Sequence, residues 1–491
     1  MKPSNLLFIF SDEHNKKVTG CYGNEFVKTP NIDKLAANGT RFTQAYTNCP
    51  ICVPARASLA TGRYVHENRC WDNAIAYKGA QPSWGHRLIP QGHDVVSIGK
   101  LHYSGYNPSQ NGFTEEIQPL HIVDGLGDLL GLIRQECPLP VRKGSAMLGP
   151  EAGPGESDYT RYDRAVRDAT IQWLKNRTKN IGDKPWVLYV GFVAPHFPLI
   201  TPQEFFDLYP EHRMTMPKQY LGEDRPTHHP FIQQLRESQI FDQGFTGQEM
   251  VRRALSAYYG LVSFLDDNIG GILSAVKEFG LSDSTRIIYS SDHGDNLGAR
   301  GLWGKSTMYE ESAGIPLIIS GEGVPKGKQC NTPVSLIDLF PTIVQCVGAT
   351  LNHEDKDLPG LSLWDIANDK EVMPRTILSE YHAAGSSTGT FMIRYGQYKY
   401  IYYVNMPPML YDVENDPEEL QDLGADPIYA DILQECDLAL RKVVDPEAVN
   451  AQCLLDQAHK IEEVGGIEAI KKRGMFRFSP PPGANPVMFK E

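Results

Sequence analysis

The chain has 491 residues, which is typical of one large domain accompanied by a smaller one. A net charge of −13 excludes nucleic acid as the main partner, because phosphate binding needs a basic face. No apolar run approaches the roughly 18 residues of a membrane helix, and the run at residues 6–10 is too short for a signal-peptide core. We therefore expect no membrane association and a cytoplasmic location, unless a leader has been trimmed. The nine scattered cysteines indicate mostly reduced thiols.

Short apolar runs alternate with helical patterns over the first 370 residues. We expect strands at residues 5–10, 94–99, 187–193, 285–290 and 315–320, and helices at residues 29–36, 159–177 and 247–279. The last helix is expected to break near Gly270 and Gly271. Residues 105–157 and 200–245 are expected to form loops that select the substrate. This alternation predicts an α/β fold with a large, mainly parallel sheet sandwiched by helices.

The pattern changes after about residue 370. Strands are expected at residues 375–381 and 391–403, with a turn around Gly396, and helices near residues 426–442 and 454–471. We therefore predict a catalytic α/β domain at residues 1–370 and a smaller α+β domain on an antiparallel sheet at residues 371–491. The extended tail after about residue 474 is expected to pack on a neighbouring subunit of a dimer or tetramer.

The stretch at residues 49–63 is expected to place a cysteine at the start of a helix. Pro54 suits a first helical turn, small residues follow it, and Gly62 is a plausible stop. Free N–H groups at such a position favour negative charge, and Arg56 adds a cation one turn later. Cys52 is therefore either a small buried residue or a reactive one in an anion pocket.

Polar side chains also recur where the predicted strands end. These are Asp12, Lys100 with His102, His196, and Asp292 with His293. Asp12, Asp292 and His293 suit a divalent cation, and the histidine favours manganese or zinc over purely calcium-like chemistry. Lys100, Lys305 and Arg56 can bind a tetrahedral anion. His102 and His196 can move protons.

The order and spacing of these residues resemble the sulfatase family of the alkaline phosphatase superfamily. Residues 52–63 match the family's Cys-x-Pro-Ser/Ala-Arg signature with its small-residue helix and Thr-Gly-Arg. The other matching positions are Asp12, the Gly99-Lys100-Leu101-His102 run, Pro195-His196, residues 291–295, and Gly304-Lys305. His293 and Asn73 look most like the branch of choline sulfatases and phosphonate monoester hydrolases. The resemblance covers roughly residues 4–425.

The resemblance implies that a formylglycine-generating enzyme converts Cys52 into formylglycine, whose hydrate is the nucleophile. It implies metal ligation by Asp12, Cys52, Asp292 and His293, with Ca²⁺ favoured and Mn²⁺ as the alternative, and it leaves open whether Glu13 also ligates. It also implies that Arg56 steadies the diol and that His102 takes a proton when sulfate leaves. The implied catalytic residues are Cys52, Arg56, Lys100, His102, His196 and Lys305, and the implied substrate contacts are Asn73, Lys100, His196 and Lys305.

We therefore expect a sulfuric ester hydrolase that cleaves a small organic O-sulfate to an alcohol and sulfate. The first alternative is a phosphonate monoester or phosphodiester hydrolase, against which Lys100 and His102 argue. The second is a catalytically silent binding protein, against which the complete set of motif positions argues. The leaving-group pocket is expected to be built from residues 103–160, 200–245 and the carboxy-terminal part, with aromatic and acidic side chains that include Tyr103, Tyr106, Tyr159, Trp303 and Asp158. They could hold a quaternary ammonium such as choline, or stack on an aryl ring or a sugar.

Overall fold

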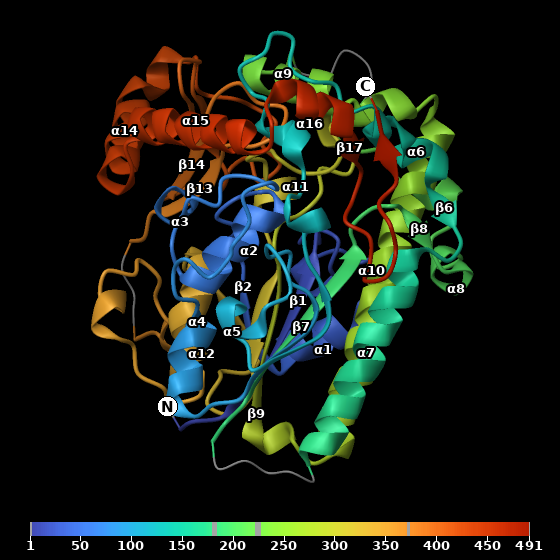
Figure 1. The fold of residues 1–491 in the computed structure, drawn as a ribbon, viewed down its shortest axis with the longest axis vertical. Coiled ribbons are helices and arrows are strands. Elements are labelled where there is room, and N and C mark those ends of the chain that lie inside the picture. The colour runs from blue at the N-terminus through green and yellow to red at the C-terminus, as the bar shows by residue number, and fades with distance from the viewer. Residues whose placement is uncertain (1, 179–183, 221–226, 371–373, 491) are drawn as a thin grey trace.

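The computed structural model describes residues 2–178, 184–220, 227–370 and 374–490 (Figure 1). Its largest sheet has eight strands in the order β11-β2-β10-β9-β1-β7-β4-β5. The strands of this sheet are β1 (Asn5–Asp12), β2 (Gly39–Phe42), β4 (Val95–Lys100), β5 (Glu115–Leu120), β7 (Val187–Pro195), β9 (Thr285–Ser291), β10 (Leu317–Ser320) and β11 (Lys328–Cys330). The central strand β1 runs parallel to both of its neighbours, with Leu6 opposite Val187 on β7 and Arg286 on β9. The prediction of a large, mainly parallel sheet is confirmed.

Strand β10 is the exception, because it runs antiparallel to both β9 and β2. Parallel neighbours need a crossover that returns the chain to the opposite edge of the sheet. Between β9 and β10 the chain makes only one short α-helix, α11 (Glu310–Ala313), and then enters β10 beside the end of β9. The residues between these two strands are therefore kept at the carboxyl edge of the sheet.

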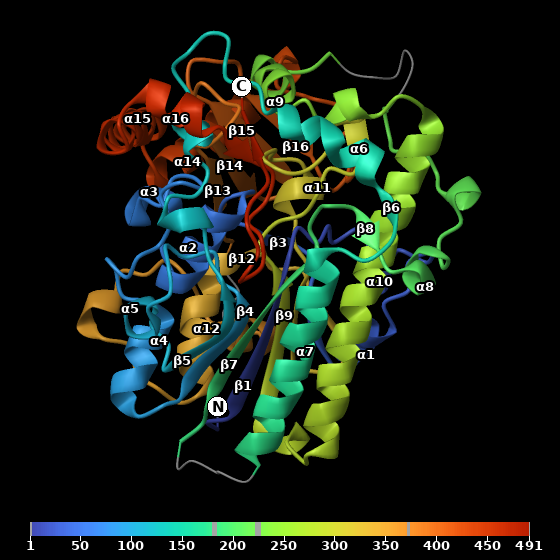
Figure 2. The ribbon, with the colours of Figure 1, turned by 45° about the vertical axis from the view of Figure 1, so that its right-hand side comes forward.

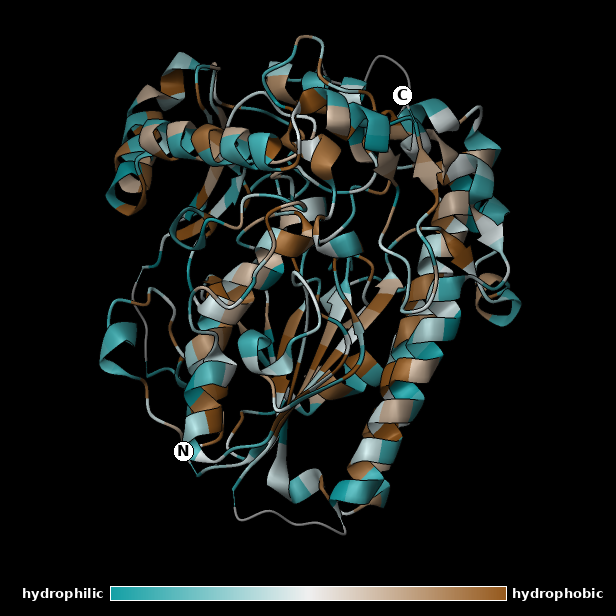
Figure 3. Cartoon of the chain, in the orientation of Figure 1, coloured by the Kyte–Doolittle hydropathy of each residue, from teal (hydrophilic) through white to brown (hydrophobic). Residues whose placement is uncertain are grey.

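Helices cover both faces of the large sheet (Figures 1 and 2). Alternate side chains of β1 enter different cores: Leu6, Phe8 and Phe10 pack in one, and Leu7 and Ile9 in the other. Figure 3 shows the strands as the most continuously hydrophobic part of the chain. The helices are α1 (Pro30–Ala37), α2 (Cys52–Thr61), α3 (Val65–Asn68), α4 (Trp84–Leu88), α5 (Pro108–Asn111), α6 (Leu148–Glu151), α7 (Asp158–Arg177), α8 (Gln203–Phe206), α9 (Pro230–Gln239), α10 (Gln248–Glu278), α11 (Glu310–Ala313), α12 (Leu339–Cys346), α13 (Leu363–Ala367), α14 (Ala430–Val443), α15 (Pro446–Glu463) and α16 (Ile467–Arg473).

Helix α10 is continuous through Gly270 and Gly271, so the predicted break is wrong. A Cβ atom at Gly270 would lie 2.5 Å from the side-chain nitrogen of Asn31 on α1. The glycine therefore permits close packing of α10 against α1 and does not interrupt the helix.

The carboxy-terminal part contains a four-stranded antiparallel sheet, in the order β13-β14-β15-β16, with helices α14 to α16 beside it. The turn predicted around Gly396 joins β14 to β15 in a hairpin. The boundary predicted between residues 370 and 371 lies against residues 371–373, outside the described part of the chain. The remaining strands are β3 (Ala45–Tyr46), β6 (Gly153–Pro154), β8 (Ile200–Thr201), β12 (Val334–Ser335), β13 (Ile377–Tyr381), β14 (Thr390–Tyr395), β15 (Tyr398–Tyr403), β16 (Met409–Asp412), β17 (Met475–Phe476) and β18 (Met488–Phe489).

Two general features complete the description. All nine cysteines are free of disulfide bonds, as predicted. Among the described residues, no helix combines the length and the apolar character needed to cross a membrane.

Candidate active site

The polar residues predicted at strand ends meet at one edge of the large sheet. Asp12 and Lys100 are the last residues of β1 and β4, His196 follows β7, and Asp292 follows β9. Because these strands run parallel, their carboxyl ends lie side by side. The topology thus gathers side chains that are up to 280 residues apart in the chain.

Helix α2 brings Cys52 to this edge. The helix begins at Cys52 and ends at Gly62, whose φ of 66° is readily adopted by glycine. Every residue of α2 is buried, and Cys52 is only 1% exposed. The side-chain oxygen of Asn73 accepts a hydrogen bond from the Val53 amide at 3.2 Å, so Asn73 satisfies a free N–H of the first turn.

Asp12, Cys52, Asp292 and His293 form a compact group of metal-binding atoms. One donor atom from each lies within 4.8 Å of all the others, and all four residues are buried. Ligands on opposite sides of a Ca²⁺ ion stand about 4.6–5.2 Å apart, because each lies 2.3–2.6 Å from the ion. The group therefore fits a divalent cation in size, and its two carboxylates and one imidazole fit it in chemistry.

Arg56 and Lys100 hold the two carboxylates in place. Arg56 donates from Nε to Asp292 at 2.8 Å and from Nη2 to Asp12 at 3.0 Å, and Lys100 Nζ lies 2.6 Å from Asp12. Arg56 Nη1 also donates to the Lys100 carbonyl and to the Tyr189 hydroxyl, each at 3.0 Å. Burial opposes ionisation of Asp12, but Lys100 and neighbouring cations hold its pKa well below the usual value. Arg56 does not line the cavity described below, so it acts by positioning the carboxylates.

Glu13 lies beside the four-residue metal group and contacts two other predicted site residues. Its Oε2 atom lies 2.9 Å from Lys305 Nζ and 3.3 Å from His196 Nε2. Burial raises the pKa of Glu13 well above its usual value, against the opposing charge of Lys305. Glu13 forms a second group of possible ligands with Asp12 and His196. Lys305 Nζ also lies 3.4 Å from Cys52 Sγ, which connects the two groups.

Both predicted proton-transfer histidines are buried. Burial, followed by the charge of Lys305, lowers the pKa of His196 well below its usual value. Burial, followed by the charge of Lys100, does the same to His102. Both rings are therefore neutral near pH 7 and can accept a proton. Burial and the nearby Asp12 carboxylate also raise the pKa of the Cys52 thiol, to about 11.

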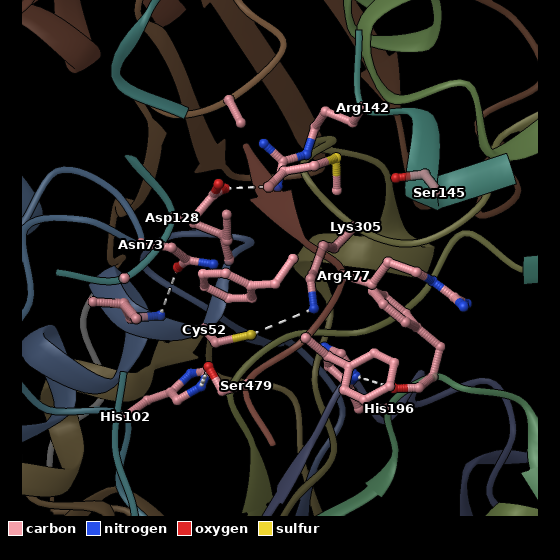
Figure 4. A pocket seen from close by; sticks show the side chains of 18 of the residues that line it. Cys52, Asn73, His102, Asp128, Arg142, Ser145, His196, Lys305, Arg477 and Ser479 are labelled. Atoms are coloured by element: carbon pink, nitrogen blue, oxygen red, sulfur yellow. Dashed lines mark hydrogen bonds and ion pairs between the residues drawn. The ribbon is translucent and has the colours of Figure 1, made fainter. Parts of the chain in front are cut away.

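A cavity with an empty volume of ≈ 760 Å³ opens above these residues (Figure 4). Cys52, Lys100, His102, His196 and Lys305 all line it, as does Asn73. Its outer wall comes from residues that the sequence pattern did not single out, namely Asp128, Arg142, Ser145, Gln239, Phe241 and the segment of residues 475–479.

The ranges expected to build the leaving-group pocket, residues 103–160, 200–245 and the carboxy-terminal part, do line the cavity, but most of the side chains named with them do not. Of the five side chains proposed for it, only Tyr159 lines the cavity. Tyr106 is 67% exposed, Trp303 stacks on Phe245, and Tyr103 packs edge-on against Tyr77. Asp158 pairs with Arg161 on the exposed face of α7. Aromatic and acidic composition alone does not show which side chains turn toward a cavity.

The first part of the carboxy-terminal tail contributes to this chain's own cavity. Residues 475–479 lie in the cavity wall, where Ser479 Oγ is 3.0 Å from His102 Nε2. Packing of the tail on a neighbouring subunit stays a prediction. No local pattern connects Ser479 with His102, because 377 residues separate them in the chain.

The chain is similar to known proteins both in sequence and in fold. The model of the Sulfatase family matches residues 4–349, and the model of "N-sulphoglucosamine sulphohydrolase, C-terminal" matches residues 298–445. The choline-sulfatase of Rhizobium meliloti (strain 1021) is 33% identical over 440 residues, which cover 86% of this chain and 83% of that protein. Arylsulfatase K of Danio rerio is 28% identical over 468 residues, covering 91% of this chain and 84% of that protein. The phosphonate monoester hydrolase of Agrobacterium radiobacter superposes with a TM-score of 0.70 at 23% identity, covering 92% and 96% of the two chains, and so shares the fold.

Proposed function

Since this chain belongs to the sulfatase family and is a sulfuric ester hydrolase, we propose that it uses a formylglycine made from Cys52 together with a divalent cation. The observation that carries this proposal is the buried group of Asp12, Cys52, Asp292 and His293 next to a cavity. Lys100 and Lys305 both line that cavity. In a group so compact, one cation can contact position 52 and both carboxylates at once.

The state of Cys52 supports its conversion. A thiol whose pKa is raised to about 11 is protonated near pH 7, and a protonated thiol is a poor nucleophile. Formylglycine at this position supplies a geminal diol as the nucleophile, and a bound cation lowers the pKa of such a hydroxyl. Conversion also replaces the sulfur with oxygen, which gives a ligand set of mainly oxygen atoms. We therefore favour Ca²⁺, with Mn²⁺ as the alternative because His293 supplies a nitrogen.

The remaining roles follow from position in the cavity. The Lys100 and Lys305 ammonium groups would neutralise sulfate oxygens as charge develops on them. Lys305 would stabilise or protonate the leaving oxygen, and His196, which lines the cavity as a neutral ring, would contact it. His102 would accept a proton when sulfate is released, because its ring is neutral. Asn73 lines the cavity beside α2 and would contact the substrate.

The charges of the outer cavity bear on the choice of substrate. Arg142 and Arg477 line it, and Asp128, the carboxylate in its lining, is ion-paired with Arg142 at 2.7 Å. The same lining also contains aromatic side chains, among them Tyr159, Phe241 and Phe478, whose faces can hold a quaternary ammonium. The leaving groups that fit this lining are therefore an aryl ring, a sugar or a quaternary ammonium such as choline.

The alternative function is hydrolysis of phosphonate monoesters or phosphodiesters. The fold is compatible with it, since a phosphonate monoester hydrolase superposes over most of the chain. Lys100 and His102 both line the cavity, and the resemblance associates this pair with sulfate esters. A cytoplasmic location, modification by a formylglycine-generating enzyme and assembly into a homo-oligomer stay predictions.

Mass spectrometry of the Cys52 peptide tests the proposal directly. The protein is made with and without a co-expressed formylglycine-generating enzyme, and hydrolysis of an aryl sulfate is measured on both samples. We expect a loss of about 18 Da on that peptide to increase in parallel with the activity. Full activity from an unmodified thiol would overturn the formylglycine mechanism.

A further inference from the structure

The carboxy-terminal segment of residues 475–479, which we call the strap, is anchored on its own chain at several points. Its first two residues form β17, which pairs with β18, so that Met475 lies opposite Phe489. Phe478 packs against Tyr159 with 5.1 Å between ring centroids, and Arg477 forms an ion pair with Glu151 at 2.5 Å. These contacts hold the strap across the wall of the cavity.

Ser479, the last residue of the strap, is buried and held through two of its atoms. Its carbonyl oxygen accepts a hydrogen bond from the Tyr159 hydroxyl at 2.6 Å. Its hydroxyl lies 3.0 Å from His102 Nε2 (Figure 4). Ser479 is 5% exposed, so water does not compete freely for this hydroxyl.

His102 depends on this contact. The His102 backbone has a φ of +60°, and its amide donates to the Leu120 carbonyl at 2.9 Å. These two features fix the direction in which the side chain leaves the backbone. Among the described residues, its Nδ1 atom is buried without a hydrogen-bond partner, so the bond to Ser479 is the one that orients the ring. When the ring proton is on Nε2, the Ser479 hydroxyl accepts a hydrogen bond from Nε2–H, and Nδ1 keeps a free lone pair.

We propose that Ser479 is a positioning residue that holds the His102 imidazole in the orientation needed to accept a proton. The inference rests on the proposed function, in which His102 accepts a proton as sulfate is released. The strap of the same chain thereby completes the active site, and the Tyr159 hydroxyl holds the strap by its hydrogen bond to the Ser479 carbonyl.

Kinetics of the full-length enzyme test the proposal first. Ser479→Ala removes the hydroxyl without adding bulk, and we expect kcat for an aryl sulfate to fall about 10- to 100-fold, the usual effect of losing such an orienting partner. KM should fall together with kcat and leave kcat/KM within about twofold, because His102 acts after the leaving alcohol has departed. Ser479→Thr keeps the hydroxyl and should restore most of kcat.

Two further variants sharpen the comparison. Tyr159→Phe removes only the bond to the Ser479 carbonyl and should lower kcat by less than Ser479→Ala. Ser387→Ala is the matched control, because the Ser387 hydroxyl bonds to Gln234 at 2.8 Å, away from the cavity lining. A Ser479→Ala enzyme within twofold of wild type in kcat, or a Ser479→Thr enzyme no better than Ser479→Ala, would overturn the proposal.

Nitrogen-15 NMR of histidine-labelled protein tests the same contact without turnover. The His102 signals are assigned by their absence from a His102→Gln sample. We expect the His102 Nε2 signal to shift in Ser479→Ala, because the hydrogen bond to the hydroxyl is lost, and to stay in place in Ser387→Ala. An unchanged His102 Nε2 signal in Ser479→Ala would refute the positioning role. If wild type cleaves no sulfate ester, the proposed function fails, whereas the NMR result still decides the role of Ser479.

Discussion

Replacement of Arg56 by alanine tests the electrostatic design of the metal group. Arg56 is 1% exposed and donates to both Asp12 and Asp292. Removing one partner from a buried ion pair costs about 3–5 kcal/mol, because the remaining charge is left without compensation. In metal-free protein, Arg56→Ala should therefore lose about 3–5 kcal/mol of unfolding free energy. The loss should shrink when Ca²⁺ is added, because a cation bound to the same carboxylates replaces part of the missing charge.

Urea unfolding followed by tryptophan fluorescence, in EDTA and then in CaCl₂, measures this effect. Arg441→Ala is the matched control, because Arg441 also bridges two acids, Asp437 at 2.8 Å and Glu447 at 2.7 Å, but on the surface. Exposed pairs contribute about 0–1 kcal/mol, so the control should lose no more than that. An Arg56→Ala protein within about 1 kcal/mol of wild type in EDTA would refute the reasoning, since it would show that the carboxylates need no buried cation.

Two further predictions concern the leaving group and a buried acid. Lys305→Ala should lower kcat/KM more for sulfate esters of weakly acidic alcohols than for nitrophenyl sulfate, because only poor leaving groups need the ammonium; equal losses across the series would contradict this role. Burial raises the pKa of Asp72 to about 6, so the folded state binds a proton more tightly than the unfolded state and stability falls as pH rises from 4 to 7. Asp72→Asn should abolish that fall, gaining about 3 kcal/mol relative to wild type over this interval, and parallel urea midpoints against pH would argue against it.

Local patterns were enough to predict the elements that carry the site. The apolar runs before Asp12, Lys100, His196 and Asp292 become parallel strands, and their ends meet as predicted. The start of α2 at Cys52 and its end at Gly62 also follow from residues within one short stretch. Such features depend on hydrophobic period, helix capping and the fixed geometry of parallel strands, all of which neighbouring residues encode.

Contacts between distant parts of the chain decided the rest. The antiparallel direction of β10 depends on where the preceding chain lies, and the continuity of α10 at Gly270 depends on its contact with Asn31. The ion pair between Glu13 and Lys305 and the hydrogen bond between Ser479 and His102 depend on which side chains the fold brings together. The sequence by itself therefore determined the family resemblance and the polar residues at the strand ends, because both depend on the spacing of residues within short stretches. Only the tertiary structure decided the cavity wall and the orientation of the catalytic groups, because packing between remote segments sets them.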